Sequence, residues 1–482
     1  MPASELGLIG LGTMGANLVY NLLSSDIDVS AYDISEQARN NLREEIAGQN
    51  SPGDLLLCQD MDELCSSLQK PRRVMLMVGA GEPVDKVLDT LLPLLSAEDI
   101  IIDGGNSNHE ATNRRQRALE QNGIRYIGAG ISGGAEGAKK GPSIMLGGNK
   151  SAYDETEHIF RKISACSDSG SCHSYFGPGG SGHFVKMVHN GIEYAIMQII
   201  ADIYYAMKEG LRLSPEKMSR IFSRWNEKEP AFLSEITADI LRKRIETSEQ
   251  DEQMPLLELI SDRAEQSGTG RWCVEEALKL NVPLFLITNA VNSRIISLQV
   301  ETREEFHRSF EKTRPAGNNA DQIFDVSSQK EIISTAESSL QLGMRTAYAE
   351  GIRLMKRGAE EYNYDIDIPE VARTWSSGCI IRSSILPEIS DAYEDEPELK
   401  DFLIHADQLS LLKENYSDLV EFTGLSIKAG LPQPGMQAAL NYVNSLKTEY
   451  LSTNMVQAQR DYFGQHGFER IDRQGTFNSD WK

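Results

Sequence analysis

The sequence predicts a doubly wound α/β domain at the N-terminus, followed by a large all-α domain with an internal duplication and by a C-terminal tail. Three observations carry this prediction. Short apolar runs alternate with helix-like stretches over the first third of the chain, which is typical of a parallel sheet with crossover helices. A glycine-rich turn follows the first run. After a second glycine-rich stretch at residues 177–182, long segments of helical periodicity take over.

Six apolar runs are the candidate strands of the α/β domain. They are residues 5–10, 28–33, 72–78, 99–103, 125–129 and 143–146. We expect this domain to span residues 1–180, the all-α domain residues 181–440, and the tail residues 441–482. The charged runs at residues 244–252, 301–319 and 391–398 are expected to be solvated loops or helix ends.

Two short motifs recur in the helical part. Met-Lys-Glu-Gly at residues 207–210 is echoed by Met-Lys-Arg-Gly at 355–358, and Pro-Glu at 215–216 by Pro-Glu at 369–370. Both pairs are separated by about the same distance, which favours a duplication. Because the matches are few, coincidence stays open as the alternative.

The charge balance excludes some classes of function. Against 48 Lys+Arg stand 71 Asp+Glu, which gives a formal net charge of −23. A field of this sign repels nucleic-acid phosphates and anionic membranes, so we expect no nucleic-acid or membrane partner. With 40% hydrophobic and 25% charged residues, the composition is that of a folded globular protein.

The cysteine spacing favours a cytoplasmic protein with free thiols. No two of the six cysteines form the close pair that zinc or a redox dithiol needs, and no metal is expected. They are Cys58, Cys65, Cys166, Cys172, Cys273 and Cys379. Residues 6–25 carry no charge, but glycines and asparagines interrupt them and no Lys or Arg precedes them, so we expect a soluble chain.

A dinucleotide fingerprint follows the first candidate strand. It reads Gly10-Leu11-Gly12-Thr13-Met14-Gly15. The first glycine permits a tight turn, the second lets the backbone approach a pyrophosphate, and the third lets helix pack on strand. The strand before it and the amphipathic segment after it predict a Rossmann-type domain, with a glycine-rich turn without ligand as the alternative.

Asp33 ends the second candidate strand and bears on the choice of cofactor. A carboxylate there accepts hydrogen bonds from both adenosine ribose hydroxyls and repels a 2′-phosphate. The next residues, Ile34 and Ser35, offer no arginine, so NAD is favoured over NADP. Two alternatives remain: Asp33 caps a turn, or a lysine or arginine from elsewhere reaches a phosphate.

One helix-like segment, residues 182–211, is a candidate for the catalytic element. Lys186, Asn190 and Glu193 share one face of it, with His189 and Tyr194 at the edges of that face. The rest of the segment is apolar, and polar groups on a buried helix need partners or a cavity. The sequence leaves two interpretations open, a functional site and an internal Lys–Glu ion pair.

Two more glycine-rich runs follow candidate strands. Asn106 lies in residues 103–107, after the fourth strand, and Ser132-Gly133-Gly134 follows the fifth. Doubly wound sheets bind ligands at the C-terminal ends of their strands, so both runs are candidate ligand loops, although each could be a plain turn.

With these segments in hand, the chain resembles the 6-phosphogluconate dehydrogenases, decarboxylating enzymes of the β-hydroxyacid dehydrogenase superfamily. The resemblance runs over nearly the whole length. It rests on residues 128–143, on Gly-His-Phe-Val-Lys-Met-Val-His-Asn-Gly-Ile-Glu-Tyr at 182–194, on 268–272, on Gly-Cys-Ile-Ile-Arg-Ser at 378–383, and on 457–466.

The resemblance implies roles for individual residues. Lys186 would be the general base and Glu193 the general acid of an oxidative decarboxylation that gives ribulose 5-phosphate. Val78, Ala80 and Asn106 would join the fingerprint in binding the cofactor. Asn106, Ser132, Gly133, Gly134, His189, Asn190, Tyr194, Thr269, Arg294, Arg460 and His466 would bind the phosphorylated sugar acid. Arg460 and His466 lie in the tail, which would act in the partner's site of an obligatory homodimer.

Some positions depart from the family pattern. Asp33-Ile34-Ser35 replaces Asn-Arg-Thr, which again favours NAD. Ser267 replaces a lysine before Gly-Thr-Gly and removes a cation from the phosphate pocket, while the two arginines remain as stronger phosphate ligands. Gly79, Ala135 and Leu146 replace a lysine, a glutamate and a proline, and the usual Phe-His-Thr-Asn-Trp of the tail reads Phe-Asn-Ser-Asp-Trp at 477–481.

Three hypotheses therefore stand. The first is an NAD-linked 6-phosphogluconate dehydrogenase. The second is a related β-hydroxyacid dehydrogenase with another sugar acid as substrate, suggested by Ser267 and Ala135. The third is a catalytically silent homologue that keeps the cofactor domain, against which the intact Lys186, Asn190 and Glu193 argue.

Overall fold

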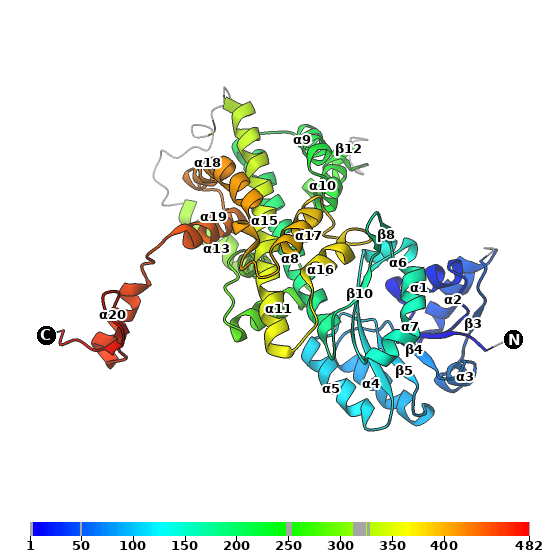
Figure 1. The fold of residues 1–482 in the computed structure, drawn as a ribbon. Helices are drawn as coiled ribbons and strands as arrows, with labels where there is room; N and C mark the ends of the chain where they lie inside the picture. The colour runs from blue at the N-terminus through cyan, green and yellow to red at the C-terminus, as the bar shows by residue number, and fades with distance from the viewer. Residues whose placement is uncertain (1–2, 49–50, 247–252, 312–323, 325–327, 482) are drawn as a thin grey trace.

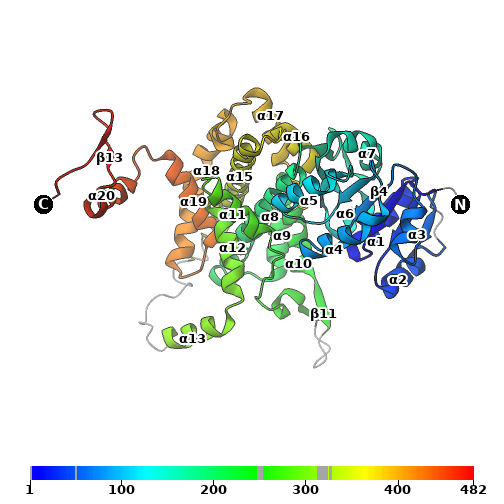
Figure 2. The same ribbon diagram turned by 90° about the horizontal axis from the view of Figure 1, so that it is seen from below.

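The computed structural model describes residues 3–48, 51–246, 253–311, 324 and 328–481. It has an α/β domain at the N-terminal end, a large helical domain, and an arm that carries the C-terminus away from both (Figures 1 and 2). The predicted fold class, a Rossmann-type domain followed by a large helical domain, is confirmed. Among the described helices, none is long and apolar enough to cross a membrane.

The α/β domain is built on one sheet of eight strands in the order β10-β7-β6-β5-β4-β1-β2-β3. The strands are β1 (Leu6–Ile9), β2 (Val29–Tyr32), β3 (Leu55–Leu57), β4 (Arg73–Leu76), β5 (Ile100–Asp103), β6 (Arg125–Ser132), β7 (Ser143–Gly148) and β10 (His173–Tyr175). All six predicted runs form strands. The sheet adds β3 and β10 at its edges, and β7 runs antiparallel to β6, so the sheet is mixed and not wholly parallel.

Helices pack on both faces of this sheet. They are α1 (Thr13–Ser24), α2 (Glu36–Ile46), α3 (Met61–Ser66), α4 (Glu82–Leu91) with a 3₁₀ turn η1 (Leu92–Leu94), α5 (His109–Glu120), α6 (Gly134–Lys140) and α7 (Lys150–Ile163), and the hairpin β8 (Cys166–Ser167) and β9 (Gly170–Ser171) follows. Asparagine, serine or aspartate side chains cap α2, α3, α5 and α7. No side chain caps α1, which leaves its first amides available to a ligand.

Two long helices, α8 and α15, run through the helical domain, and the others surround them. The elements are α8 (Ser181–Tyr205) with a π-helical turn η2 (Ala206–Gly210), α9 (Pro215–Lys228), α10 (Phe232–Arg242), β11 (Arg244–Glu246), β12 (Gln253–Pro255), η3 (Leu256–Leu259), α11 (Thr269–Lys279), α12 (Leu286–Ser297), α13 (Val300–Glu311), α15 (Gln329–Tyr362), α16 (Ile368–Trp375), α17 (Ile385–Asp395), η5 (Phe402–Ile404), α18 (Ala406–Lys428) and α19 (Pro434–Lys447). The predicted tail boundary at residue 441 falls inside α19.

The charged runs are more ordered than the sequence predicts. Residues 244–246 form β11 and pair with β12, and the run that begins at residue 301 is helix α13 as far as Glu311. The run at 391–398 contains the end of α17, as predicted. Residues 247–252 and 312–319 lie outside the described residues. Charged side chains such as Glu and Arg form helix well, so charge alone did not indicate a loop.

Matched buried carboxylates support the predicted duplication. Asp202 on α8 accepts hydrogen bonds from the amides of Gly435 and Met436 at the start of α19, at 2.7 and 2.9 Å. Glu350 on α15 accepts from Phe285 and its successors at the start of α12. Each carboxylate lies five residues before its Met-Lys motif. Each long helix therefore caps a neighbour from an equivalent position.

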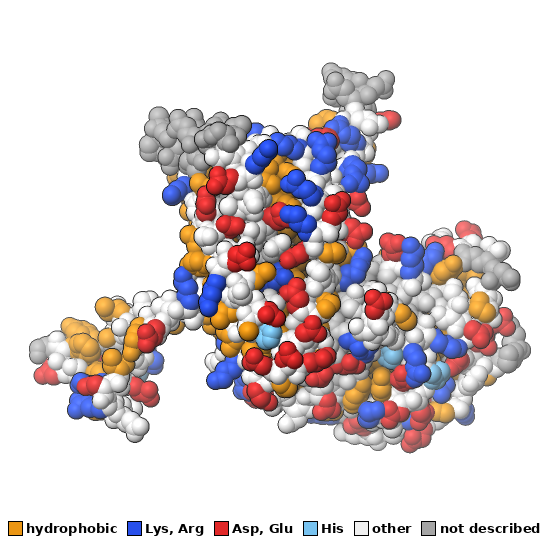
Figure 3. Space-filling view, turned by 45° about the horizontal axis from the view of Figure 1, so that its top comes forward, with side chains coloured by type: hydrophobic (Ala, Val, Ile, Leu, Met, Phe, Trp, Pro, Cys, Tyr) orange, Lys and Arg blue, Asp and Glu red, His pale blue; other side chains and the backbone are white. Residues whose placement is uncertain are grey.

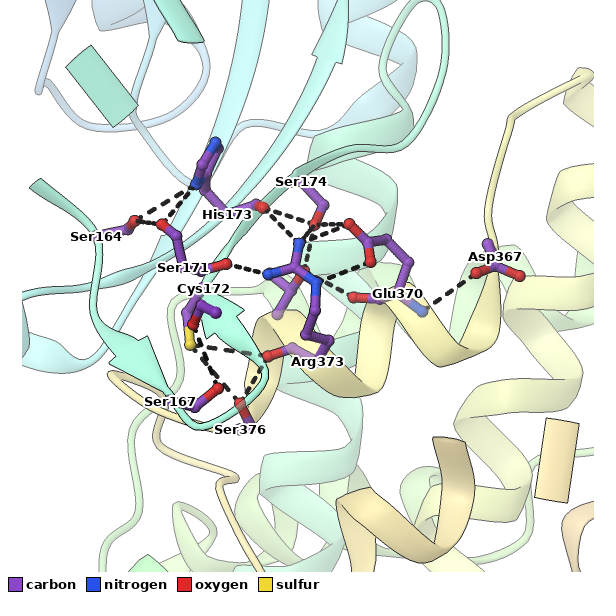
Figure 4. A network of polar contacts seen from close by, with 12 residues as sticks. Ser164, Ser167, Ser171, Cys172, His173, Ser174, Asp367, Glu370, Arg373 and Ser376 are labelled. Atoms are coloured by element: carbon purple, nitrogen blue, oxygen red, sulfur yellow. Dashed lines mark hydrogen bonds and ion pairs between the residues drawn. The ribbon is translucent and has the colours of Figure 1, made fainter. Parts of the chain in front are cut away.

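A polar cluster joins the two domains where β10 meets α16 (Figure 4). The Arg373 guanidinium donates to the carbonyl of His173 at 2.9 Å, to Ser174 Oγ at 2.6 Å and to Glu370 of its own helix. It also donates to the carbonyl of Ser171. These bonds fix the helical domain against the edge of the sheet.

The C-terminal arm leaves the body after α19. It carries α20 (Thr453–Gly464) and a small hairpin of β13 (Phe468–Glu469) and β14 (Thr476–Phe477). Hydrophobic side chains gather on it (Figure 3). Exposed ones are Tyr450, Leu451, Met455, Val456, Tyr462 and Phe463. Such an exposed apolar surface is typical of a protein–protein contact.

Candidate functional site

The fingerprint forms a turn with an open side. Gly10 has φ of 101°, and a Cβ there would lie 2.5 Å from the carbonyl oxygen of Met77. At Gly12, by contrast, a Cβ would meet nothing within 4 Å. The open side of Gly12 and the uncapped amides of α1 together offer room and donors for a pyrophosphate. The residues present therefore fit a dinucleotide.

Asp33 is held by backbone amides. Its two carboxylate oxygens accept hydrogen bonds from Leu11 N at 2.6 Å and from Ser35 N at 2.7 Å. The carboxylate thus ties β2 to the fingerprint turn, and its remaining lone pairs can still accept from ribose hydroxyls. Ile34 beside it is 90% exposed. Arg39 of α2, which the sequence analysis did not single out, donates to the Asp33 carbonyl.

Loops after neighbouring strands complete the cofactor side. Val78 and Ala80 follow β4, and Asn106 follows β5, so all three lie at the C-terminal edge of the sheet. The Asn106 side chain is exposed and bonds to no other described residue. It is available to a ligand.

Helix α8 places Lys186 deep between the two domains. The side chain is 5% exposed, and a Cβ at Gly130 of β6 would overlap it, so the glycine is what lets α8 lie directly on the strand. Burial lowers the pKa of the Lys186 amine, while nearby Glu193 opposes the shift. Burial in turn raises the pKa of the Glu193 carboxyl against the pull of Lys186 and Arg294.

The Lys–Glu ion pair that the sequence left open does not form. No contact within 4.0 Å joins Lys186 to Glu193, although both are described residues. The Lys186 amine instead lies 3.2 Å from His189 Nδ1. The Glu193 side chain is 18% exposed. Amine and carboxyl are therefore separate groups on one face of the helix.

His189 is the centre of a buried hydrogen-bonded cluster. Its Nδ1 lies 3.0 Å from Asn190 Oδ1, and its Nε2 lies 2.9 Å from both Ser132 Oγ and Cys379 Sγ. Burial lowers the pKa of His189 well below its ordinary value, so the ring carries one proton. Asn190 Oδ1 only accepts, which assigns that proton to Nδ1. A neutral Lys186 amine can accept from the same N–H, whereas an ammonium cannot.

Cys379 belongs to this cluster and sequence reasoning missed its role. It reaches Ser132 and His189 from a loop of the helical domain, 190 residues beyond His189, and burial raises its pKa to about 11. The thiol is therefore protonated and can donate to Nε2. The only signal in the sequence was the Gly-Cys-Ile-Ile-Arg-Ser motif itself.

The two glycines after Ser132 start α6, and Gly133 packs against the carbonyl of Gly378.

A second set of residues lies beyond Asn190. Its Nδ2 donates to Thr269 Oγ1 at 2.9 Å, at the first turn of α11. The Arg294 guanidinium lies 3.5 Å from the centre of the Tyr194 ring. Ser267 Oγ lies 3.5 Å from Thr269 Oγ1, so the departure at this position leaves a hydroxyl beside Thr269. These side chains offer one cation and several donors to an anion.

Arg460 and His466 are not brought to this site by their own chain. Arg460 lies on α20 and donates to Gln457 of the same helix, and His466 follows α20. Figures 1 and 2 both show the arm on the side of the helical domain away from the sheet.

Within the part of the chain that the structure describes, one group of possible metal ligands is found, at His109, Glu110 and Glu276 between the domains. His109 Nε2 lies 3.2 Å from Glu276, and Lys279 pairs with Glu110 and lies 3.7 Å from Glu276. Because Lys279 already neutralises these carboxylates, the group fits a domain contact better than a metal site.

Comparisons with known proteins decide the family. The model of the NAD binding domain of 6-phosphogluconate dehydrogenase matches residues 5–176, and that of the 6-phosphogluconate dehydrogenase C-terminal domain matches residues 182–481. The chain belongs to the 6-phosphogluconate dehydrogenase family. It is thus an oxidoreductase.

Relatives of this family match the whole chain. A 6-phosphogluconate dehydrogenase from Bacillus subtilis, named NADP(+)-dependent and decarboxylating, is 40% identical over 484 residues, 100% of both chains. A decarboxylating one from Staphylococcus epidermidis is 40% identical over 479 residues, 99% of each. The Plasmodium falciparum 6-phosphogluconate dehydrogenase, studied in apo form and with NADP+ or 6-phosphogluconate, superimposes with a TM-score of 0.91 at 33% identity, over 99% of this chain and 100% of that one.

Proposed function

We propose that the protein oxidatively decarboxylates 6-phospho-D-gluconate to D-ribulose 5-phosphate and CO2 and passes the hydride to a nicotinamide dinucleotide. The observation that carries this proposal is the buried amine of Lys186, held beside His189 and free of the Glu193 carboxylate. Burial lowers the pKa of this lysine and so favours the neutral amine, which can act as a base.

The residues of α8 supply the acid–base chemistry. Neutral Lys186 takes the proton of the 3-hydroxyl. A dinucleotide held at the fingerprint turn would accept the hydride from C3 as its nicotinamide is reduced. The product is a 3-keto acid. Lys186, now protonated, donates a hydrogen bond to the new carbonyl, which stabilises the negative charge that builds there as the C1–C2 bond breaks and CO2 departs. Glu193 then protonates the enediol at the carbon that lost CO2, and the keto sugar is released.

The remaining polar residues suit the two ends of the substrate. Ser132, with the amides of Gly133 and Gly134, is proposed to bind the carboxylate, and His189 and Asn190 the hydroxyls. At the other end, Thr269, Tyr194 and Arg294 are proposed to bind the phosphate. Arg294 offers a planar pair of donors, which suits phosphate oxygens, and its stacking on Tyr194 holds it in place.

For the cofactor we propose NAD in preference to NADP. A carboxylate at Asp33 accepts from ribose hydroxyls and repels a 2′-phosphate. Arg39 is the opposing feature, because its guanidinium lies next to Asp33, and the Bacillus subtilis relative is named NADP(+)-dependent. The test is the ratio of kcat/KM for NAD and NADP. Asp33→Asn should move the ratio towards NADP, and Arg39→Ala should move it towards NAD or leave it unchanged. An Asp33→Asn enzyme with the original ratio removes Asp33 from the argument.

We also propose a cytoplasmic homodimer in which the arm serves the partner. All six cysteines are free thiols. The arm exposes an apolar surface and carries Arg460 and His466 away from their own site, so a second copy can both cover the surface and receive these two side chains. Activity per subunit should fall when the protein is diluted to monomers. A fully active monomer refutes the role of the arm.

A different sugar acid is the second candidate, favoured by Ser267 where the family has lysine. The deciding experiment is a steady-state assay with 6-phosphogluconate, gluconate and other aldonates, in which reduced cofactor and CO2 are followed together. The proposal predicts equal amounts of both from 6-phosphogluconate and little turnover of unphosphorylated acids. Preference for gluconate would favour an enzyme for another sugar acid. Cofactor binding without turnover of any acid would favour a catalytically silent homologue.

A further inference from the structure

Buried hydrogen bonds to the Asp103 carboxylate hold the loop that carries Asn106. Asp103, at the end of β5, is fully buried and accepts from the Gly105 amide at 3.1 Å, from Ser107 Oγ at 2.7 Å and from Tyr126 OH at 2.8 Å. A Cβ at Gly105 would lie 2.9 Å from the Val78 carbonyl, so this loop is pressed against the loop after β4. The backbone around Asn106 therefore has little freedom within the α/β domain.

A second support comes from the helical domain. His183 lies on α8, one turn before Lys186, and is 1% exposed. Its Nε2 lies 3.0 Å from the carbonyl oxygen of Gly105, and its Nδ1 lies 2.7 Å from Thr112 Oγ1. The ring fits because Gly128 has no side chain, since a Cβ there would lie 2.8 Å from Nδ1.

The partners of the ring define its proton. A carbonyl oxygen only accepts, so Nε2 must carry hydrogen and Nδ1 must accept. The Thr112 hydroxyl lies 2.7 Å from Nδ1 and 3.1 Å from the Asn108 carbonyl oxygen, and its one hydrogen goes to Nδ1, the nearer acceptor. Burial lowers the pKa of His183, which is consistent with a neutral ring that has one N–H. The N–H of Nε2 thus donates a hydrogen bond to the Gly105 carbonyl and connects α8, which carries Lys186, to the loop that carries Asn106.

We propose that His183 is a positioning residue for hydride transfer, which holds the Gly105 carbonyl and with it Asn106 in a fixed relation to Lys186. The inference rests on the proposed function and on the contacts with cofactor and substrate that the family resemblance implies for Asn106. Hydride transfer depends steeply on the distance and alignment of donor and acceptor carbons. A link between cofactor loop and base helix keeps that alignment when both domains move slightly.

Two substitutions separate the hydrogen bond from the bulk of the side chain. In His183→Gln the amide nitrogen takes roughly the place of Nε2 and keeps a donor for Gly105. In His183→Asn the amide is shorter and takes roughly the place of Nδ1, so that donor is lost. We expect kcat of His183→Asn to fall by about 10- to 100-fold, the loss typical of a small misalignment of reacting groups, while His183→Gln stays near wild type.

The readout that a purely structural role does not move is the primary isotope effect with substrate deuterated at C3. It should rise in His183→Asn, because hydride transfer becomes more rate-limiting, and stay at the wild-type value in His183→Gln. Cofactor binding and thermal unfolding, measured on both, show that the sites remain folded. An unchanged isotope effect in His183→Asn, or equal losses in both variants, overturns the proposal.

Thr112→Val provides a second test if His183→Asn does not fold. It removes the hydroxyl that donates to Nδ1 and so frees the ring to carry its proton there, which should again raise the isotope effect, whereas an unchanged effect refutes the link. The wild-type assay keeps the two proposals apart. Absence of wild-type turnover with 6-phosphogluconate refutes the function, while turnover with indifferent variants refutes only the role of His183.

Discussion

Replacing Lys186 by methionine tests the assignment of the base. Methionine has nearly the length of lysine and is apolar. Its side chain can therefore fill the same space between α8 and Gly130 of β6 without burying an amine. The fold and the fingerprint turn should be unaffected, because His189 is the only described residue that lies within hydrogen-bond distance of the lysine amine. The substitution therefore removes a proton acceptor and little else.

The size of the effect follows from that single loss. A positioned general base contributes about 10²- to 10⁴-fold to a rate, or roughly 3 to 5 kcal/mol at 1.36 kcal/mol per tenfold. Lys186 also stabilises the charge on the carbonyl during decarboxylation, so Lys186→Met should lie near the upper end of this range. We expect kcat to fall about 10⁴-fold with cofactor affinity unchanged.

The assay is the absorbance of reduced nicotinamide at saturating 6-phosphogluconate, with cofactor affinity measured separately by fluorescence. Lys208→Met is the matched control, since it makes the same substitution after the end of α8, outside the site, and it should keep full activity. If Lys186→Met retains a tenth or more of the wild-type kcat, the base is another group.

Three further outcomes are expected. Glu193→Gln should reduce one equivalent of cofactor per site in a fast first turnover and then stall, because the carboxyl acts only on the enediol; a linear time course without a burst argues for an earlier role. Arg294→Lys should raise KM for 6-phosphogluconate with a smaller change in kcat, since lysine loses the paired donors and the stacking on Tyr194; an unchanged KM removes it from the phosphate pocket. Asp202→Ala should lower the free energy of unfolding by about 1 to 3 kcal/mol, because the amides that it caps at the start of α19 stay buried and unsatisfied; urea unfolding measures this, and an unchanged midpoint denies the capping role.

The sequence predicted the Rossmann-type domain because apolar runs and the fingerprint are local signals. It missed β3 and β10, which are only three residues long and lie at the edges of the sheet. It also predicted a parallel sheet, whereas β7 is antiparallel, since the direction of a strand depends on its connection and not on its side chains.

The part of the site that lies on helix α8 was predictable from the sequence. Lys186, Asn190 and Glu193 share a face because of helical spacing alone. Cys379 and Thr269 reach the same cluster from distant segments, and only tertiary packing brings them together. The choice between an ion pair and a free base could not be made from the sequence, because it depends on side-chain directions within about 1 Å.

The pH dependence of kcat/KM tests the central claim most directly, because it asks whether the base is a neutral buried lysine. Lys186 must lose its proton to act, so activity rises as pH passes its lowered pKa, and Glu193 must hold its proton, so activity falls above its raised pKa. We predict a bell whose ascending limb lies below the lysine value of 10.5 and disappears from the residual activity of Lys186→Met. An ascending limb that persists unchanged in Lys186→Met would contradict the account.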